Sequence, residues 1–205
     1  RHDIAVDTIT DDELDAATGA GLAAAYDLIV FPAHTEYATD SALAAITGFR
    51  DRGGNLIFLS ANNFFWRVER SGEQITRTRQ WRNLGKPESA LIGVQYRAND
   101  EGQKQKPFIV RDTSRAPWLW EGTGLTTGSL LGAEIGGYGT EIDGTSPASP
   151  PGTLVLAEVP DLLGPGKTAQ MTYYETAQGA KVFAAGTLDF GGSVLGQPQD
   201  RLLQN

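Results

Sequence analysis

The sequence predicts an α/β sandwich built around a parallel β-sheet, with additional strands in its second half. Two strongly apolar segments, 26–31 and 56–59, are separated by a segment with helical periodicity and short connections. A strand–helix–strand unit of this kind crosses over right-handed onto a parallel sheet. After residue 60 this alternation stops, and hairpin patterns and glycine-rich loops follow. We therefore expect the second half to be β-rich.

The first predicted elements are a short strand and a helix. Residues 4–6 are apolar and form the strand candidate. Thr10 and Glu13 fit a capping box, because a hydroxyl at the cap and a carboxylate three residues later satisfy free backbone amides at a helix start. Gly19 and Gly21 lie in the Ala-rich helix that follows, and they weaken it.

The next elements form the βαβ unit. Segment 26–31 carries a continuous apolar run, which is typical of a strand covered on both faces. Apolar side chains then repeat at helical spacing in 40–52, and Gly53-Gly54 ends this helix. Segment 56–59 is the second buried strand. We expect the two strands to be parallel neighbours in one sheet.

The second half contains two predicted hairpins and long loops. Segments 64–69 and 75–79 form the first hairpin, and segments 171–174 and 181–185 form the second. Between them lie a polar loop at 97–106, irregular loops at 118–152 and a strand at 153–157.

Length and composition fit one globular domain. The 205 residues are 40% hydrophobic and 20% charged, which is an ordinary globular composition. We expect a single domain over residues 1–205, with a βαβ core at 1–63, a β-rich and loop insertion at about 64–152 and return strands at 153–205. Because the sequence begins with Arg1 rather than Met, we also expect a processed or partial chain.

Composition also excludes several classes of function. The chain has no cysteine, which removes disulfides, cysteine-rich zinc sites and a thiol nucleophile. A net charge of -8 argues against binding to a phosphate backbone, so we expect no nucleic-acid partner. No apolar run approaches the roughly 18 residues of a membrane span, so we expect no membrane partner. The predicted location is soluble, either cytoplasmic or secreted.

Polar side chains follow both predicted strands of the βαβ unit. His34, Glu36 and Tyr37 follow the first strand, and Asn62 and Asn63 follow the second. Ligands of open α/β sheets bind outside the carboxyl ends of the strands, so we expect the two loops to share one pocket. His transfers protons or binds metals, Glu acts as a base or ligand, and a Tyr phenolate is a hard oxygen donor suited to Fe(III). These five residues are the predicted catalytic residues.

The same residue types also have structural interpretations. His34 can cap a helix or bind backbone carbonyls, and the ring of Tyr37 can pack against its neighbours. Arg77, Arg79 and Arg82 form a local basic stripe, which we interpret as a solvated face rather than as an anion site.

Two segments resemble one known family. Residues 26–37, which end in His34-Thr35-Glu36-Tyr37, resemble the "strand, then His-x-Glu-Tyr" segment of the N,N-dimethylformamidase large-subunit family. Residues 53–67 resemble its "Gly-Gly, strand, Asn, aromatic, Trp-Arg" segment. Weaker similarities follow at 118–124, 136–143 and 186–190.

This resemblance implies a fold and a cofactor. The fold is that of class I glutamine amidotransferases, a flavodoxin-like sandwich with a parallel sheet, here with a β-rich insertion. Those amidotransferases carry a cysteine nucleophile at the corresponding turn, and the absence of cysteine excludes their glutaminase chemistry. The dimethylformamidase branch holds one iron by two Tyr and one Glu, and this iron polarises the amide carbonyl and activates water.

The resemblance also assigns metal ligands residue by residue. Tyr37 is the matched iron ligand, and either Glu121 or Glu141 supplies the carboxylate. The second Tyr ligand is expected upstream, where Tyr26 stands at the start of a strand, the wrong end for the site.

Two functions are compatible with these observations. The first is a hydrolase of amide or other non-peptide C–N bonds, acting on a small-molecule substrate, with iron as the implied cofactor and a homo- or hetero-oligomer as the implied assembly. The alternative is a non-catalytic binding or assembly domain of a larger protein, since a fold does not fix a function.

Overall fold

The main sheet of the protein is mixed rather than parallel. The computed structural model describes residues 5–193 and 199–205. Seven strands lie in the order β1-β3-β14-β13-β12-β8-β9. Their bounds are β1 Leu28–Phe31, β3 Asn55–Phe58, β8 Phe108–Val110, β9 Leu130–Leu131, β12 Leu154–Val159, β13 Ala169–Glu175 and β14 Lys181–Ala184.

Only three of these strands are parallel to one another. β3 pairs in parallel with β1 and β14, whereas the remaining pairs of this sheet are antiparallel. The α/β class is therefore confirmed, but the predicted parallel arrangement does not extend across the sheet. The reason is local: β12 and β13 are joined by the loop 160–168, and β13 and β14 by a short turn, and both connections reverse the direction of the chain.

The βαβ unit forms as expected from the sequence. β1 leads through β2 (Tyr37–Ala38) and helix α3 (Asp40–Arg50) to β3, which lies beside β1. The hydroxyl of Thr39 accepts a hydrogen bond of 3.1 Å from the amide of Ala42 and caps α3. The predicted hairpins also form, since β4 (Trp66–Ser71) pairs antiparallel with β5 (Gln74–Gln80), and β13 does so with β14.

The first predicted helix is two helices. α1 (Asp11–Ala16) begins with the predicted capping box of Thr10 and Glu13, and α2 (Gly19–Ala25) begins at a second cap, Thr18. Gly19 is buried, and a Cβ placed on it would lie 2.4 Å from the backbone carbon of Gly48 in α3. The glycine therefore allows α2 to approach α3 closely.

This contact gives a test of the packing of α2 on α3. We expect Gly19→Ala to lower the free energy of unfolding by about 1–3 kcal/mol, because the methyl group must push two backbones apart. Gly21→Ala is the matched control in the same helix: Gly21 is exposed and its Cβ would meet only the Thr18 hydroxyl, at 3.3 Å. Urea unfolding checks both variants, and equal effects would contradict this account.

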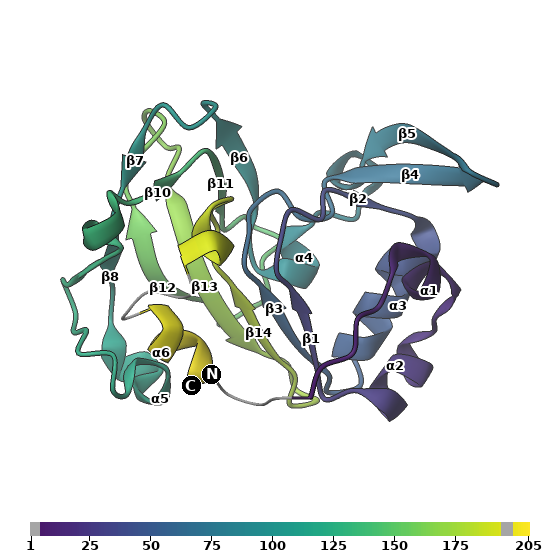
Figure 1. Cartoon of the computed structure of the whole chain (residues 1–205), viewed down its shortest axis with the longest axis horizontal. Coiled ribbons are helices and arrows are strands. Elements are labelled where there is room, and N and C mark those ends of the chain that lie inside the picture. Colours follow the sequence, from purple (N-terminus) through teal and green to yellow (C-terminus); the bar gives the residue numbers. More distant parts are fainter. Residues whose placement is uncertain (1–4, 194–198) are drawn as a thin grey trace.

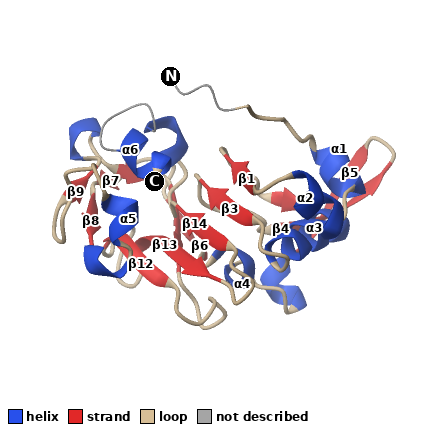
Figure 2. Cartoon of the chain, turned by 90° about the horizontal axis from the view of Figure 1, so that it is seen from below, coloured by secondary structure: helices blue, strands red, loops and turns tan. Residues whose placement is uncertain are grey.

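The sheet separates two apolar clusters. Successive residues of β13 and β14 alternate between them: Tyr174, Val182 and Ala184 lie in one, and Tyr173 and Phe183 lie in the other. The first cluster packs under α2 and α3, and under α4 (Ser89–Ile92). The second packs under α5 (Pro117–Trp120) and α6 (Gln199–Gln204). Figure 2 shows α2 and α3 toward one end of the row of strands, and α5 and α6 toward the other.

Segment 26–31 was predicted to be buried on both faces, and this prediction is wrong. β1 is the edge strand of the sheet, and Leu28 and Val30 remain 44% and 43% exposed. An apolar run is the same in an edge strand and a central one, so the sequence does not distinguish them. Of the predicted strand 4–6, residues 5 and 6 lie in a loop, and residue 4 lies outside the described residues.

Three small sheets complete the described fold. β2, β4 and β5 form one, and Figure 1 shows its hairpin β4–β5 extending away from the main sheet above α1. The others pair β6 (Gln95–Asn99) with β11 (Glu141–Gly144), and β7 (Gln105–Lys106) with β10 (Tyr138–Gly139). Short 3₁₀ helices occur at Trp81–Leu84, Thr113–Arg115, Ala133–Ile135 and Phe190–Ser193. Within the described ranges, no helix has the length and apolar character needed to cross a membrane.

Candidate active site at the strand ends

The carboxyl ends of β1, β3 and β14 meet at one edge of the sheet. The amide of Leu59 donates to Phe31 O at 2.9 Å, and the amide of Ala185 donates to Phe58 O at 2.8 Å. The loop after β14 then holds β11 at this edge, because the Asp143 amide donates to Gly186 O at 2.9 Å. Side chains of β11 are thereby brought to the loops that carry the predicted site residues.

His34 and Glu141 are the first pair at this edge. His34 Nε2 lies 3.3 Å from Glu141 Oε2, and their side chains are 33% and 12% exposed. The other oxygen of Glu141 accepts a hydrogen bond of 3.0 Å from Asn99 Nδ2. Oε2 itself is buried and receives no well-aligned hydrogen bond from the described residues. The imidazole is therefore close to a carboxylate that has an unused lone pair.

Asn62 connects Glu36 with a third carboxylate, Asp143. The backbone N–H of Asn62 donates to both oxygens of Asp143, at 2.9 and 3.1 Å. The Asn62 side-chain Nδ2 donates to Glu36 Oε1 at 3.2 Å. Asn62 has a φ of 56°, a left-handed conformation that is tolerated better by Asn than by most residues. Its buried Oδ1 has no hydrogen-bond partner in the part of the chain that the structure describes.

Asp143 is fully buried and has a strongly shifted acidity. Burial raises the pKa of Asp143 to about 7, and the nearby Glu88 and Glu141 carboxylates add to this rise. The hydrogen bonds from the backbone amide of Asn62 and the positive charge of the Arg82 guanidinium act in the other direction and lower the pKa of Asp143. A carboxyl group with this pKa exchanges a proton near neutral pH, a property that general acids and bases share.

Tyr96 stands between these carboxylates and an aromatic wall. Burial raises the pKa of the Tyr96 phenol, and the carboxylates of Glu141, Asp143 and Glu36 raise it further. Its ring centroid lies 5.1 Å from that of Phe65, which in turn lies 5.1 Å from that of Trp66. The cluster of His34, Glu36, Asn62, Tyr96, Glu141 and Asp143 is called the strand-end cluster below.

Sequence reasoning did not identify Asp143 and Tyr96 as site residues. Asp143 carries no local signal in the sequence, although Glu141 and Asp143 stand two residues apart in one strand. Tyr96 is a lone tyrosine in β6 and carries no local signal. Both reach the cluster through the pairing of β6 with β11, which joins segments about 45 residues apart.

Tyr37 lies beside the cluster rather than inside it. Tyr37 is 49% exposed, so its ring is not enclosed in the core. A hydrogen bond to the Glu36 carboxylate raises the pKa of Tyr37, and the nearby Arg77 guanidinium opposes this rise. The Tyr37 hydroxyl therefore lies between an acid and a cation.

Two other predicted residues lie elsewhere. Asn63 is buried within the turn, where Oδ1 accepts from the Thr35 amide at 3.3 Å and Nδ2 donates to Ser60 O at 3.1 Å. The backbone of Glu121 is held by Asn205, beside a cavity lined by the first residues of β1, β3 and β14. The structure thus brings Glu141, but not Glu121, to the strand-end cluster.

The iron site implied by the family resemblance consists of two Tyr and one Glu. Within the described residues there is no group of three His, Asp or Glu side chains arranged to hold a metal ion, but that observation does not bear on tyrosine ligands. The Tyr37 hydroxyl is already bonded to Glu36 and has the Arg77 cation beside it, which is unfavourable for a second cation. Tyr26 caps the end of α2, before β1. The iron site stays a prediction, and no chemical step below uses it.

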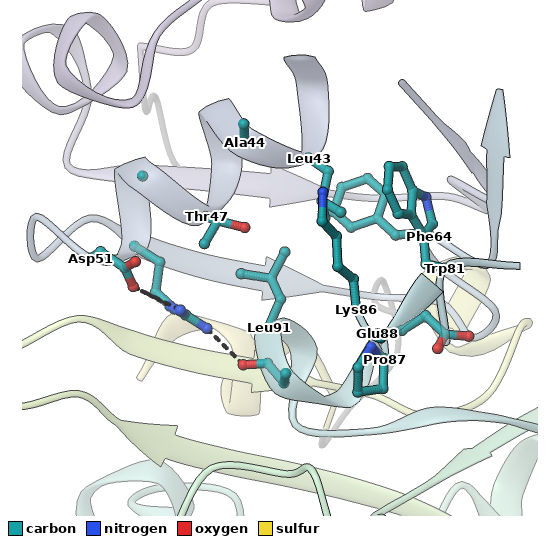
Figure 3. Close-up of a pocket in the computed structure, with 14 residues that line it drawn as sticks. Leu43, Ala44, Thr47, Asp51, Phe64, Trp81, Lys86, Pro87, Glu88 and Leu91 are labelled. Carbon is teal, nitrogen blue, oxygen red and sulfur yellow. Dashed lines mark hydrogen bonds and ion pairs between the residues drawn. The ribbon is translucent and has the colours of Figure 1, made fainter. Parts of the chain in front are cut away.

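A cavity of about 570 Å³ lies apart from the strand-end cluster, between α3 and the 81–91 segment. Figure 3 shows Leu43 and Thr47 of α3 on one side of it and Leu91 on the other, with Lys86 extended beside Phe64 and Trp81. The walls of the cavity are mostly apolar. Among the charged residues that line it, Arg50 and Asp51 form an ion pair with each other at 2.7 Å. This cavity suits a small apolar ligand, and the predicted site residues are not part of its lining.

Comparison with known proteins agrees with the resemblance of the strand-end loops. Residues 1–200 match the family described as N,N-dimethylformamidase beta subunit-like, C-terminal. The chain is also 23% identical over 248 aligned residues to the N,N-dimethylformamidase beta subunit of Alcaligenes sp. That alignment covers 95% of this chain and 32% of the relative, so the chain spans about a third of the relative's length. The chain belongs to the N,N-dimethylformamidase beta subunit-like, C-terminal family.

Proposed function

We propose that this protein hydrolyses amide or other non-peptide C–N bonds at the strand-end cluster. The observation that carries the proposal is the pairing of His34 Nε2 with Glu141 Oε2, a buried oxygen that receives no well-aligned hydrogen bond, together with the buried Asn62 Oδ1, which lacks a hydrogen-bond partner among the described residues. Buried acceptors without partners are costly, and a bound water or substrate group would satisfy them. Membership in a family named after an amidohydrolase subunit supports the same reaction class.

The cluster offers a base and a hydrogen-bond acceptor for amide hydrolysis. Water adds to the amide carbonyl carbon, the C–N bond breaks, and the proton taken from water is passed to the leaving nitrogen, so that an acid and an amine are released. His34 accepts and returns this proton, and the Glu141 carboxylate stabilises the imidazolium that forms in between. Asn62 Oδ1 accepts a hydrogen bond from the attacking water and holds it in place.

The direct test is an amide panel with the purified protein. Formamide, N,N-dimethylformamide, acetamide and N-methylacetamide are incubated with it, and release of amine and acid is measured by NMR. We expect turnover of at least one simple amide above the rate without protein. No turnover in this panel or among larger amides would contradict the proposal.

The cavity between α3 and the 81–91 segment supports a second candidate, a binding module without catalysis. Its volume of about 570 Å³ is large enough for a small ligand. The relative is named as a subunit, and we propose that this chain also works within an oligomer. A module of this kind would bind ligands in the cavity and leave every amide of the panel intact.

A further inference from the structure

Arg77 is a cation without an acidic partner beside the strand-end cluster. Its guanidinium carbon lies 4.5 Å from the centroid of the Trp66 ring. No ion pair of Arg77 or Arg79 with a carboxylate occurs within residues 5–193 and 199–205, whereas three other arginines of this region are paired. These pairs are Arg67 with Asp40 at 2.7 Å, Arg70 with Asp12 at 2.5 Å and Arg82 with Glu88 at 2.6 Å.

The sequence interpretation of Arg77, Arg79 and Arg82 as one basic stripe is wrong, because the three side chains go to different places. Arg82 turns inward to the buried carboxylate of Glu88. Arg77 pairs across the hairpin with Val68, and Arg79 pairs with Arg67. The register shift between these pairs leaves Thr78 as an extra residue, and the neighbouring residues of β4 place Arg77 and Arg79 on opposite faces of the small sheet.

Arg77 shares its face with groups that lead into the strand-end cluster. Tyr37 pairs in register with Trp66, and its hydroxyl lies against both Arg77 and Glu36. Glu36 accepts the hydrogen bond from Asn62 at 3.2 Å. A continuous row of polar contacts therefore runs from Arg77 at the surface to Asn62 in the cluster.

We infer that the substrate carries a carboxylate, which binds to the Arg77 guanidinium beside the ring of Trp66. This inference rests on the proposed function, because it assigns the non-reacting end of the same substrate. The carboxylates of Glu36, Glu141 and Asp143 repel an anion, so the anionic end points away from them. The amide group is then directed toward His34, and Arg77 sets both affinity and orientation.

The test compares matched pairs of amides that differ in one carboxylate. N-Formyl-, N-acetyl- and N-benzoylglycine are each compared with the corresponding N-ethylamide, which keeps the acyl group and replaces the carboxylate by a methyl group. Binding is measured by isothermal titration, and turnover is measured separately by amine release. We expect at least one carboxylate compound to bind about tenfold or more tightly than its neutral partner.

Arg77→Gln removes this preference, and Arg79→Gln, on the opposite face, keeps it. Equal binding of the two members of every pair, or equal losses in the two variants, would overturn the inference.

The experiment distinguishes failure of the proposed function from failure of the anion site. Turnover without a preference for the carboxylate keeps the hydrolase and removes the anion site, whereas an Arg77-dependent preference without any turnover keeps the anion site and removes the hydrolase.

Discussion

His34→Gln and Glu141→Gln are each expected to lower kcat/KM for amide hydrolysis by about 10²- to 10⁴-fold, the usual contribution of a general base. Glutamine cannot accept a proton from water, so His34→Gln removes the base. Glu141→Gln keeps the shape of the side chain but removes the charge 3.3 Å from the imidazole. Initial rates on the best amide of the panel, measured against substrate concentration, check both variants.

Glu121→Gln is the matched control for Glu141→Gln. The family resemblance allows either glutamate to act at the site, and the structure places Glu121 at the opposite edge of the sheet, beside Asn205. We expect Glu121→Gln to keep the activity of the unaltered protein. Activity that survives in Glu141→Gln, or that is lost equally with Glu121→Gln, would remove Glu141 from the mechanism. Circular dichroism melting curves separate loss of chemistry from loss of fold.

The residues predicted from sequence for this site are those on loops that follow neighbouring parallel strands. His34 and Asn62 could be placed together because β1 and β3 are joined by one helix, and the direction of such a crossover is fixed. Glu141 was carried over only from family resemblance, and Asp143 was missed. Their strand, β11, reaches the site through long-range pairing with β6 and through the loop after β14. No periodicity in a single sequence encodes those contacts.

The same distinction explains the fold. Local rules identified the capping box at Thr10, helix α3 and both hairpins, because each depends on residues close in sequence. The order of the outer strands depends on which strands become neighbours, and this is decided by packing between distant segments. Leu28 is an example of a residue whose burial could not be predicted from the sequence. Its exposure follows from the place of β1 at the edge of the sheet rather than from its own residue type.

We expect the free energy of unfolding of the unaltered protein to fall as pH rises from about 4 to about 7, because of Asp143. In Asp143→Asn this contribution to the fall is absent. Burial raises the pKa of Asp143 to about 7 in the folded state, against about 3.9 for an unperturbed Asp. Between these values the folded state holds a proton that the unfolded state has released, so stability falls with rising pH. A difference of about three pKa units corresponds to about 4 kcal/mol. The uncharged side-chain amide introduced at position 143 still offers an oxygen to the backbone N–H of Asn62, and it does not titrate.

Urea unfolding between pH 4.5 and 8.5 measures this effect as the difference in unfolding free energy between the protein and its variant. Asp112→Asn is a control of opposite sign, because hydrogen bonds from Ser114 lower the pKa of the Asp112 carboxyl. Stability contributed by a lowered pKa is present above the unfolded pKa and is lost as pH falls, so this variant should be weakened at neutral pH and not in acid. A difference for Asp143→Asn that is constant across the range would mean that Asp143 stays ionised.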